Sequence, residues 1–298
     1  MSAPDPKPLF ERITLIGSGL IGSSIARVVK LHNLAGEITV VARSQSTLDT
    51  MADLGLTDKT TLDLVEAVKN ADLIILCTPL GTYKSIAKAI GSSLKSGAII
   101  SDVGSCKNIM FTDVGPYLSD KVHMVPGHPI AGTEHSGPKA GTADLFKNRW
   151  CILTPGPGAN ITAVNRVAEL WRQIGTDVEI MDANHHDQVL ALTSHLPHLI
   201  AYTIVGTATD LEDDLKKEVL KYSASGFRDF TRIASSDPIM WRDIFLKNKD
   251  AVLNVLGRFT EDLISLQSAI QQEDSDKLED HFSRTRTIRR GIIDANQE

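Results

Sequence analysis

Among the side chains that could do chemistry on a small anionic ligand are the imidazole of His128 and the guanidinium of Arg232. Histidine has an ordinary pKa of about 6.5, so the neutral ring of His128 can accept a proton at physiological pH. The planar guanidinium of Arg232 suits a carboxylate, to which it can donate two parallel hydrogen bonds. Because the formal net charge of the chain is -6, its overall field does not attract anions, and such a ligand needs local cations.

A glycine-rich turn lies near the N-terminus, between a predicted strand over Arg12–Ile16 and a predicted helix over Leu20–Leu31. In this context Gly17 permits a tight turn, Gly19 lets the backbone approach a pyrophosphate, and Gly22 lets helix and strand pack closely. The start of the helix also offers free N–H groups and the positive end of its dipole to phosphates. An ordinary glycine turn is the less favoured interpretation. The predicted cofactor contacts in this turn are Gly17, Gly19, Leu20, Ile21 and Gly22.

The residues after the next two predicted strands are further candidates for cofactor contacts, and those after the second strand indicate which dinucleotide is bound. Enzymes that use NAD usually carry a carboxylate after the second strand, but this chain has Arg43 and Ser44 after Glu37–Ala42. Both side chains can hydrogen-bond a 2′-phosphate, which favours NADP, although an enzyme that uses NAD or both stays possible. Thr78 and Pro79 follow the third strand and either line the nicotinamide side of the site or form a simple turn.

The elements that position these residues alternate between strands and helices in the first part of the chain. Helices are predicted over Tyr83–Leu94 and Ile161–Ile174, in addition to the one after the glycine turn. This alternation predicts an α/β fold, a Rossmann-like and mostly parallel sheet with helices on both faces. The predicted strands are Arg12–Ile16, Glu37–Ala42, Leu73–Cys77, Ala98–Val103, Val122–Val125, Trp150–Thr154 and Asp177–Met181.

After Asp182 the pattern is helical to the end of the chain, so we predict two domains. Residues 1–182 form the dinucleotide-binding domain, and residues 183–298 form an all-helical domain for substrate binding and dimerisation. A helical domain with several long apolar faces often buries them in a homodimer. The predicted helical segments are His185–Leu211, Leu215–Tyr222, Met240–Ser268 and Lys277–Ile293.

The composition is that of an ordinary globular protein, with 298 residues of which 42% are hydrophobic and 23% charged. The acidic net charge argues against a dedicated nucleic-acid binder. The N-terminal residues lack the apolar core of a signal peptide, and no apolar run approaches the roughly 20 residues that span a bilayer. Three widely spaced cysteines without a CxxC pair fit a reducing compartment. We therefore expect a cytoplasmic protein that binds neither nucleic acid nor a membrane.

Four stretches of sequence, the last of them in two parts, carry a resemblance to one enzyme family. Read together, they resemble the prephenate/arogenate (cyclohexadienyl) dehydrogenases, and the resemblance covers nearly the whole chain. The stretches are Asp102–Lys107 (DVGSCK), Gly127–Glu134 (GHPIAGTE), Ser194–His198 (SHLPH), Phe227–Ala234 (FRDFTRIA) and Ser236–Trp241 (SDPIMW).

The resemblance implies an oxidative decarboxylation on the route to tyrosine. A hydride leaves the ring carbon that bears the hydroxyl, and the ring carboxylate leaves as CO2. His128 matches the histidine that hydrogen-bonds the ring hydroxyl, Ser105 matches the serine that helps to position it, and Arg232 matches the arginine that holds a carboxylate. The other substrate contacts that the resemblance implies are Ser194, His198 and Thr133, with Trp241 closing the pocket.

Four of these residues also have a plain structural interpretation. His128 could be a loop histidine satisfied by backbone, and Ser105 could cap a helix that starts near Lys107. Arg232 could pair with a neighbouring aspartate, with Arg228 as the competing ligand for the carboxylate. Trp241 could belong to the core, which is the commoner fate of a helical tryptophan.

Other classes of function fit the sequence less well. The histidines at 185, 186, 195 and 198 lack an HExxH pattern or a carboxylate cluster, so no metal site is expected. A β-hydroxyacid dehydrogenase should show a lysine in a glycine-asparagine context on the helical domain, which we do not find. A non-catalytic dinucleotide sensor predicts binding without turnover.

Without a recognisable regulatory module, any inhibition by tyrosine is expected to be competitive. The choice between prephenate and arogenate stays open, with a lean toward prephenate because the imidazole of His198 suits a keto acid.

Overall fold

The computed structural model describes residues 7–209, 218, 221–222 and 224–294. The chain divides into two compact units, Met1–Lys249 and Asp250–Glu298. The first unit contains both sheets and the helices that follow them, and the second contains most of a long helix and the helix after it. The predicted helix Leu215–Tyr222 lies outside the described residues, except for three of its positions.

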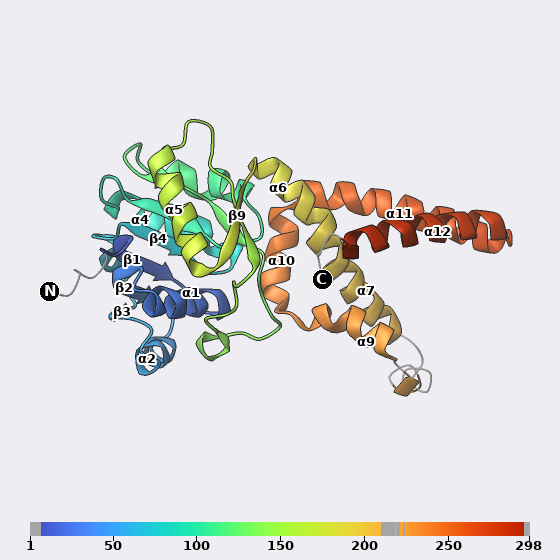
Figure 1. Ribbon diagram of the computed structural model, residues 1–298, viewed down its shortest axis with the longest axis horizontal. Helices are drawn as coiled ribbons and strands as arrows, with labels where there is room; N and C mark the ends of the chain where they lie inside the picture. The colour runs from blue at the N-terminus through green and yellow to red at the C-terminus, as the bar shows by residue number, and fades with distance from the viewer. Residues whose placement is uncertain (1–6, 210–217, 219–220, 223, 295–298) are drawn as a thin grey trace. The chain divides into compact units, whose positions relative to one another are not determined.

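The larger sheet has six strands, all parallel, in the order β3-β2-β1-β4-β5-β6. This confirms the predicted Rossmann-like fold. Strands β1 to β4 are labelled in Figure 1. The short edge strand β3 was not predicted, because its sequence Lys-Thr-Thr has no apolar pattern. The strands are β1 (Phe10–Ile16), β2 (Ala35–Val41), β3 (Lys59–Thr61), β4 (Leu73–Leu76), β5 (Ile99–Asp102) and β6 (His123–Met124).

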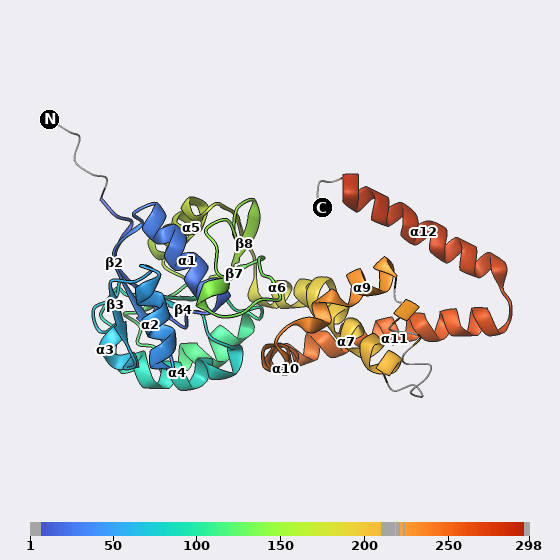
Figure 2. The same cartoon turned by 90° about the horizontal axis from the view of Figure 1, so that it is seen from below.

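Both faces of this sheet are covered, so its central strands are apolar on both sides. In β4, Leu73 and Ile75 pack into one apolar cluster while Ile74 and Leu76 pack into the other. This follows from the two-residue period of a strand. Helices α1 (Leu20–Leu31) and α4 (Tyr83–Ile90) lie on opposite sides of β4 (Figure 2). The other helices of the sheet domain are α2 (Gln45–Asp53), α3 (Leu64–Val68) and α5 (Ile161–Ile174).

A second sheet of three strands corrects the prediction of a single sheet. Strand β7 (Gly127–Pro129) pairs antiparallel with β8 (Arg149–Leu153), which pairs parallel with β9 (Thr176–Ile180). Pro126 separates β6 from β7, and a proline has no N–H group to donate to the ladder. The chain therefore leaves the first sheet there, and His128 lies on the edge strand of the second.

Helices follow β9 to the end of the described chain, as predicted. Within the first unit a π-helical segment, Ala191–His195, joins two of them, and a 3-10 turn, Arg232–Ser235, joins two others. The helices are α6 (Ala183–Leu190), α7 (Leu196–Thr209), α9 (Ser225–Thr231), α10 (Pro238–Lys247), α11 (Lys249–Gln271) and α12 (Ser275–Asp294).

The predicted helix Met240–Ser268 is interrupted at Asn248. The Asn248 side chain is buried and donates hydrogen bonds to the backbone oxygen of Asp187 (2.7 Å) and to Nδ1 of His195 (3.1 Å). An asparagine side chain that bonds elsewhere favours a helix end over a helix interior. The break therefore ties the end of α10 to α6 and to the π-helical segment.

One helical stretch, Ala183–Ala208, is long and apolar enough by length and composition to cross a membrane. The expectation that no apolar run approaches this length was therefore wrong for this stretch. It nevertheless carries His186, Asp187 and His195, all three of which are buried within the first unit. Their contacts with the sheet domain, described below, are those of a helix packed on protein.

Candidate active site

The glycine turn has the close backbone approaches that a dinucleotide site needs. Gly17 has a φ of +98°, and a Cβ there would lie 2.8 Å from the backbone oxygen of Cys77. A Cβ at Gly22 would lie 2.3 Å from the backbone oxygen of Gly17. At Gly19, by contrast, a Cβ would meet none of the described atoms within 4 Å. The turn is closed toward the protein and open where a phosphate would approach.

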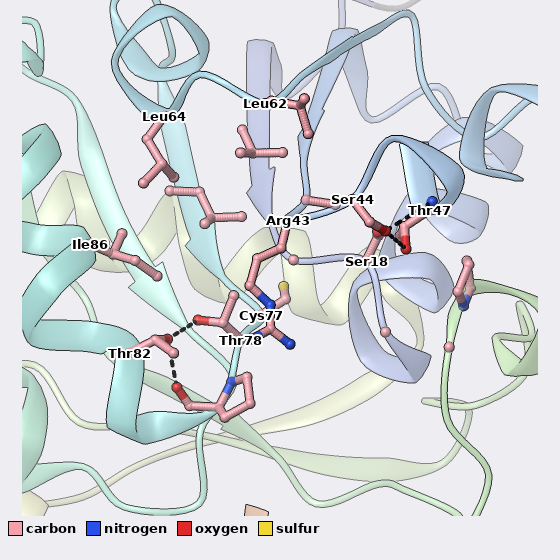
Figure 3. A pocket seen from close by; sticks show the side chains of 18 of the residues that line it. Ser18, Arg43, Ser44, Thr47, Leu62, Leu64, Cys77, Thr78, Thr82 and Ile86 are labelled. Atoms are coloured by element: carbon pink, nitrogen blue, oxygen red, sulfur yellow. Dashed lines mark hydrogen bonds between the residues drawn. The ribbon is translucent and has the colours of Figure 1, made fainter. Parts of the chain in front are cut away.

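A cavity of about 900 Å³ opens beside this turn, at the carboxyl ends of β1, β2 and β4 (Figure 3). Hydrogen bonds between Thr78 and Thr82 (2.8 Å) and from Thr82 to the oxygen of Pro79 (2.7 Å) hold its lower wall. The volume and the glycine turn suit a dinucleotide. The predicted cofactor contacts that line this cavity are Gly17, Gly19, Arg43, Ser44, Thr78 and Pro79.

Arg43 and Ser44 occupy different parts of the cavity wall. The Ser44 hydroxyl caps α2, where it bonds the backbone and the side chain of Thr47. In Figure 3 the Arg43 side chain runs into the cavity, away from Ser44 and Thr47. Both residues are exposed, so both are open to a ligand at the end of β2.

A second cavity of about 410 Å³ adjoins the first, with which it shares Gly19, Arg43, Thr78 and Pro79. A ligand here would lie against the nicotinamide end of a bound dinucleotide. The predicted residues on its wall are Leu20, Ile21, Ser105, His128 and Thr133. The helical part of the chain contributes Ser236, Asp237, Ile239, Met240 and Ile244.

His128 lies at the end of a chain of buried side chains. Its Nδ1 is 2.8 Å from Nε2 of His186, and Nδ1 of His186 is 2.8 Å from Oδ1 of Asp187. The two rings meet edge to face. His128 is 8% exposed and His186 is fully buried. The sheet domain and helix α6 therefore build this part of the site together.

The hydrogen-bonding rules fix the tautomer of both rings. A carboxylate only accepts, so Nδ1 of His186 carries a proton and donates it to Asp187. The neutral ring of His186 then has a bare Nε2, which accepts from Nδ1–H of His128. The remaining nitrogen of His128, Nε2, is left with a free lone pair. The arrangement therefore presents His128 as a proton acceptor on the wall of the second cavity.

The surroundings keep both rings neutral and Asp187 ionised. Burial, followed by the charge repulsion of His186 and then of Lys107, lowers the pKa of His128 well below its ordinary value. Burial also lowers the pKa of His186, against the opposing effect of Asp187. Burial alone would raise the pKa of Asp187, but hydrogen bonds from His186 and from the backbone of Asn108 and Lys107 leave it below its ordinary value.

Asp187 also caps the segment that follows Ser105. Its oxygens accept from the backbone N–H groups of Lys107 (2.7 Å) and Asn108 (3.0 Å) and from the Asn108 side chain (2.9 Å). The structural interpretation of Ser105 was that its side chain caps these backbone N–H groups. Ser105 instead lines the second cavity together with His128, while the side chain that contacts the His128 ring is His186.

The predicted substrate residues of the helical part form a contact chain that reaches the rim of the second cavity. His198 bonds the backbone oxygen of Ser194 (2.8 Å) and stacks on Trp241, with ring centroids 3.6 Å apart. Arg232 is close enough for its charge to lower the pKa of His198, after the larger effect of burial. Arg232 also pairs with Glu134 (3.4 Å), which lines the cavity.

These four helical residues do not themselves belong to the cavity wall that the structure defines. Trp241 is buried in the apolar cluster around α4, which is the structural interpretation allowed for it from the sequence. Arg232 is exposed and pairs with Glu134, whereas the sequence suggested aspartate partners near it in the chain.

Sequence reasoning missed His186 and Asp187 as parts of the site. In the sequence, His186 stands out only as one of a group of histidines that could suggest a metal site. The contact between His128 and His186 joins residues 58 positions apart, which no local pattern reports. The available signal was a histidine followed by an aspartate at the start of a helix in the domain that was predicted to bind the substrate.

The fold and the adjoining cavities define a protein with a dinucleotide-binding α/β domain and a helical domain. Residues 25–180 match the family model for the nucleotide-binding domain of prephenate dehydrogenase, and residues 182–284 match the model for its dimerization domain. The chain therefore belongs to the prephenate dehydrogenase family.

Relatives similar over nearly their whole length agree with this assignment. The cyclohexadienyl dehydrogenase of Zymomonas mobilis is 41% identical over 94% of this chain and 96% of that protein. Prephenate dehydrogenase from Aquifex aeolicus, solved in complex with hydroxyphenyl propionate and NAD+, has a TM-score of 0.87 at 32% identity, covering 95% and 98%. Synechocystis arogenate dehydrogenase has a TM-score of 0.79 at 26% identity, covering 94% and 99%.

Proposed function

We propose that this protein oxidises prephenate, arogenate or both, with loss of CO2, as a step in tyrosine biosynthesis. The observation that carries the proposal is His128, which lies on a cavity that adjoins the glycine turn and whose hydrogen bond to His186 leaves Nε2 as its proton-accepting nitrogen. Membership of the prephenate dehydrogenase family supports the substrate class. The β-hydroxyacid alternative is not favoured, because both family matches are to prephenate dehydrogenase.

The residues of this chain divide the work of the reaction. The bound nicotinamide dinucleotide supplies the hydride acceptor. Nε2 of His128 accepts the proton of the ring hydroxyl as the carbon that bears it is oxidised. Arg232 holds a substrate carboxylate, while Ser105 and Thr133 contact the substrate from the sheet side. Aromatisation drives the departure of CO2, so the protein mainly has to orient the ring.

Substrate choice depends on the end of the side chain, which is a keto acid in prephenate and an amino acid in arogenate. Ser194 and His198 are the residues proposed to face it. Burial lowers the pKa of His198, so its ring is neutral at physiological pH and does not repel an ammonium group. We propose that the enzyme accepts both substrates or prefers prephenate, and that His198→Ala changes the kinetics on at least one of them.

For the cofactor we propose NADP, with NAD as the alternative. Arg43 and Ser44 stand at the end of β2, where a carboxylate would bind the ribose of NAD. The exposed Arg43 guanidinium can turn to a 2′-phosphate, and the start of α2 offers N–H groups to the same anion.

The proposal also covers the domain boundary, the oligomeric state and the cellular compartment. The boundary between the functional domains lies near Asp182, the helical domain forms a homodimer, and the protein works in the cytoplasm. The description of the second family model as a dimerization domain supports the homodimer.

The deciding experiment is a steady-state comparison of prephenate and arogenate, each with NAD and with NADP. Formation of reduced nicotinamide, followed by its near-ultraviolet absorbance, is expected with at least one of the four pairs. Dinucleotide binding without turnover on either substrate would instead identify a non-catalytic sensor and end the proposal.

A further inference from the structure

We infer that His186 is a proton-relay residue: the proton that His128 takes from the substrate is matched by transfer of the Nδ1 proton of His128 to His186, which Asp187 stabilises. The inference rests on the proposed function for the identity of the substrate. Its physical basis is the continuous hydrogen-bonded chain from the wall of the second cavity to a buried carboxylate.

The geometry of the chain permits this transfer. Both nitrogen-to-partner distances are 2.8 Å, which is an ordinary hydrogen-bond length along which a proton can move between two atoms. When both ring nitrogens of His128 carry a proton, the Nδ1–H group points at the lone pair on Nε2 of His186, which can accept that proton.

The charges around the two rings decide where the positive charge is more stable. On His128 it would be buried and repelled by the ammonium of Lys107, whose positive charge lowers the pKa of His128. On His186 it would contact the Asp187 carboxylate directly. Coulomb attraction at contact distance in a buried site is large, so the pair favours His186.

The groups that face the two rings come from several elements, and each has a definite effect. Helix α6 contributes Asp187, which favours a charged His186, and the segment after β5 contributes Lys107, which disfavours it. Asp102 at the end of β5 adds a smaller favourable effect on His186. His195 from the π-helical segment acts on His128 only by adding to the repulsion when it is itself charged.

The step balances as follows. The hydroxyl O–H bond breaks and its proton bonds to Nε2 of His128, while the Nδ1–H bond of His128 breaks and that proton bonds to Nε2 of His186. The electron pair of the carbinol C–H bond leaves with the hydride. His128 ends neutral in its other tautomer, and His186 ends as an imidazolium paired with Asp187. The product oxygen keeps a neutral hydrogen-bond donor beside it. When CO2 leaves and the ring becomes aromatic, the oxygen takes the proton back from Nε2 of His128, and the proton on Nε2 of His186 returns to Nδ1 of His128.

The kinetic test compares His186→Gln with wild type, with His195→Gln as the matched control. A glutamine oxygen can still accept from Nδ1–H of His128, so the tautomer is kept and only the relay is lost. The turnover number is expected to fall roughly 10–100-fold, because a weakened general base costs rate on this scale. The acid limb of kcat/KM is expected to move to lower pH by about one unit, since protonation then has to remain on His128.

The control substitutes a histidine that is equally buried but outside the relay, since His195 bonds Asn248. His195→Gln is expected to leave the acid limb in place. In mixtures of light and heavy water, wild type should show the curved rate dependence of two moving protons, and His186→Gln a linear one. A lower rate in His186→Gln at every pH, with an unmoved limb and the same curvature as wild type, would show a merely structural role and overturn the relay.

An independent readout uses the ring nitrogens of isotope-labelled protein without substrate. As the pH falls, NMR is expected to show His128 changing from its Nδ1–H to its Nε2–H tautomer while His186 gains a second proton. A fully protonated His128 beside a neutral His186 would overturn the relay. If wild type oxidises a substrate but fails this test, the relay is wrong and the proposed function stands. If wild type passes this test but oxidises neither substrate, the proposed function is wrong.

Discussion

Lys107 and Asp102 form an ion pair in which both side chains are completely buried. Asp102 also accepts from the Tyr83 hydroxyl (3.1 Å) and from the backbone N–H of Gly127 (3.1 Å), while Lys107 donates to the Gly127 oxygen (2.6 Å). The pair therefore ties the end of β5 to the start of β7, one residue before His128. It holds the proposed base in register with the parallel sheet.

Substitution of Lys107 by methionine should strongly destabilise the protein. Removing one partner leaves the Asp102 charge buried and unpaired, which typically costs about 3–5 kcal/mol. Lys95→Met is the matched control, because the Lys95–Asp72 pair is partly exposed (36% and 22%) and such pairs contribute about 0–1 kcal/mol. Urea unfolding measures both. Equal losses in the two variants would contradict the buried pair as a structural anchor.

Substitution of Arg43 by alanine should discriminate between the two dinucleotides. A charge-assisted hydrogen bond to a phosphate contributes roughly 1.5–3 kcal/mol, so KM for NADP should rise about 10–100-fold. KM for NAD, which lacks the 2′-phosphate, should change little. Steady-state kinetics with saturating substrate provide the test. If KM rises equally for NADP and for NAD, Arg43 contacts a part of the dinucleotide that both cofactors share.

Substitution of Arg232 by lysine should weaken substrate binding while cofactor binding is kept. Lysine keeps the charge but loses the planar fork, so KM for the substrate should rise about 10-fold or more. Glu134→Gln is the control, since it removes the ion pair with Arg232 and leaves the guanidinium in place. A KM that rises equally in both variants would mean that Arg232 acts through Glu134 and not on the substrate.

The stability of the protein should fall as the pH is lowered from about 6.5 to about 4. Burial lowers the pKa of His195 from 6.5 to about 4, so in this window the unfolded chain binds a proton that the folded chain does not. At 1.36 kcal/mol per pKa unit, His195 alone lowers the free energy of unfolding by about 3 kcal/mol across this pH window. In His195→Gln, whose amide can still accept from Asn248, urea unfolding at several pH values should show a smaller loss. An unchanged loss would count against the buried neutral ring.

The parts of the fold that sequence predicts are those that local pattern determines. Helices α1 and α5 have the predicted bounds, since amphipathic spacing and adjacent glycine or asparagine residues mark their ends. The break at Asn248 was missed because its cause is a pair of hydrogen bonds to residues far away in the chain. The second sheet was missed because strand pattern reports burial and not which strands pair.

The same distinction applies to the site. The glycine turn and His128 can be identified because short motifs carry them, and the structure places both on adjoining cavities. The His186–Asp187 pair is buried by tertiary packing between β7 and α6, so no spacing in the sequence could place it beside His128. The contact between Arg232 and Glu134 spans 98 positions and was unpredictable for the same reason.

The most direct measurement is the turnover of prephenate by His128→Asn, made alongside a binding assay for the dinucleotide. Loss of the proton acceptor should lower kcat by roughly two to four powers of ten, while the cofactor binds as in wild type. A variant that binds the cofactor and turns over at the wild-type rate would remove His128 from the chemistry and contradict the account.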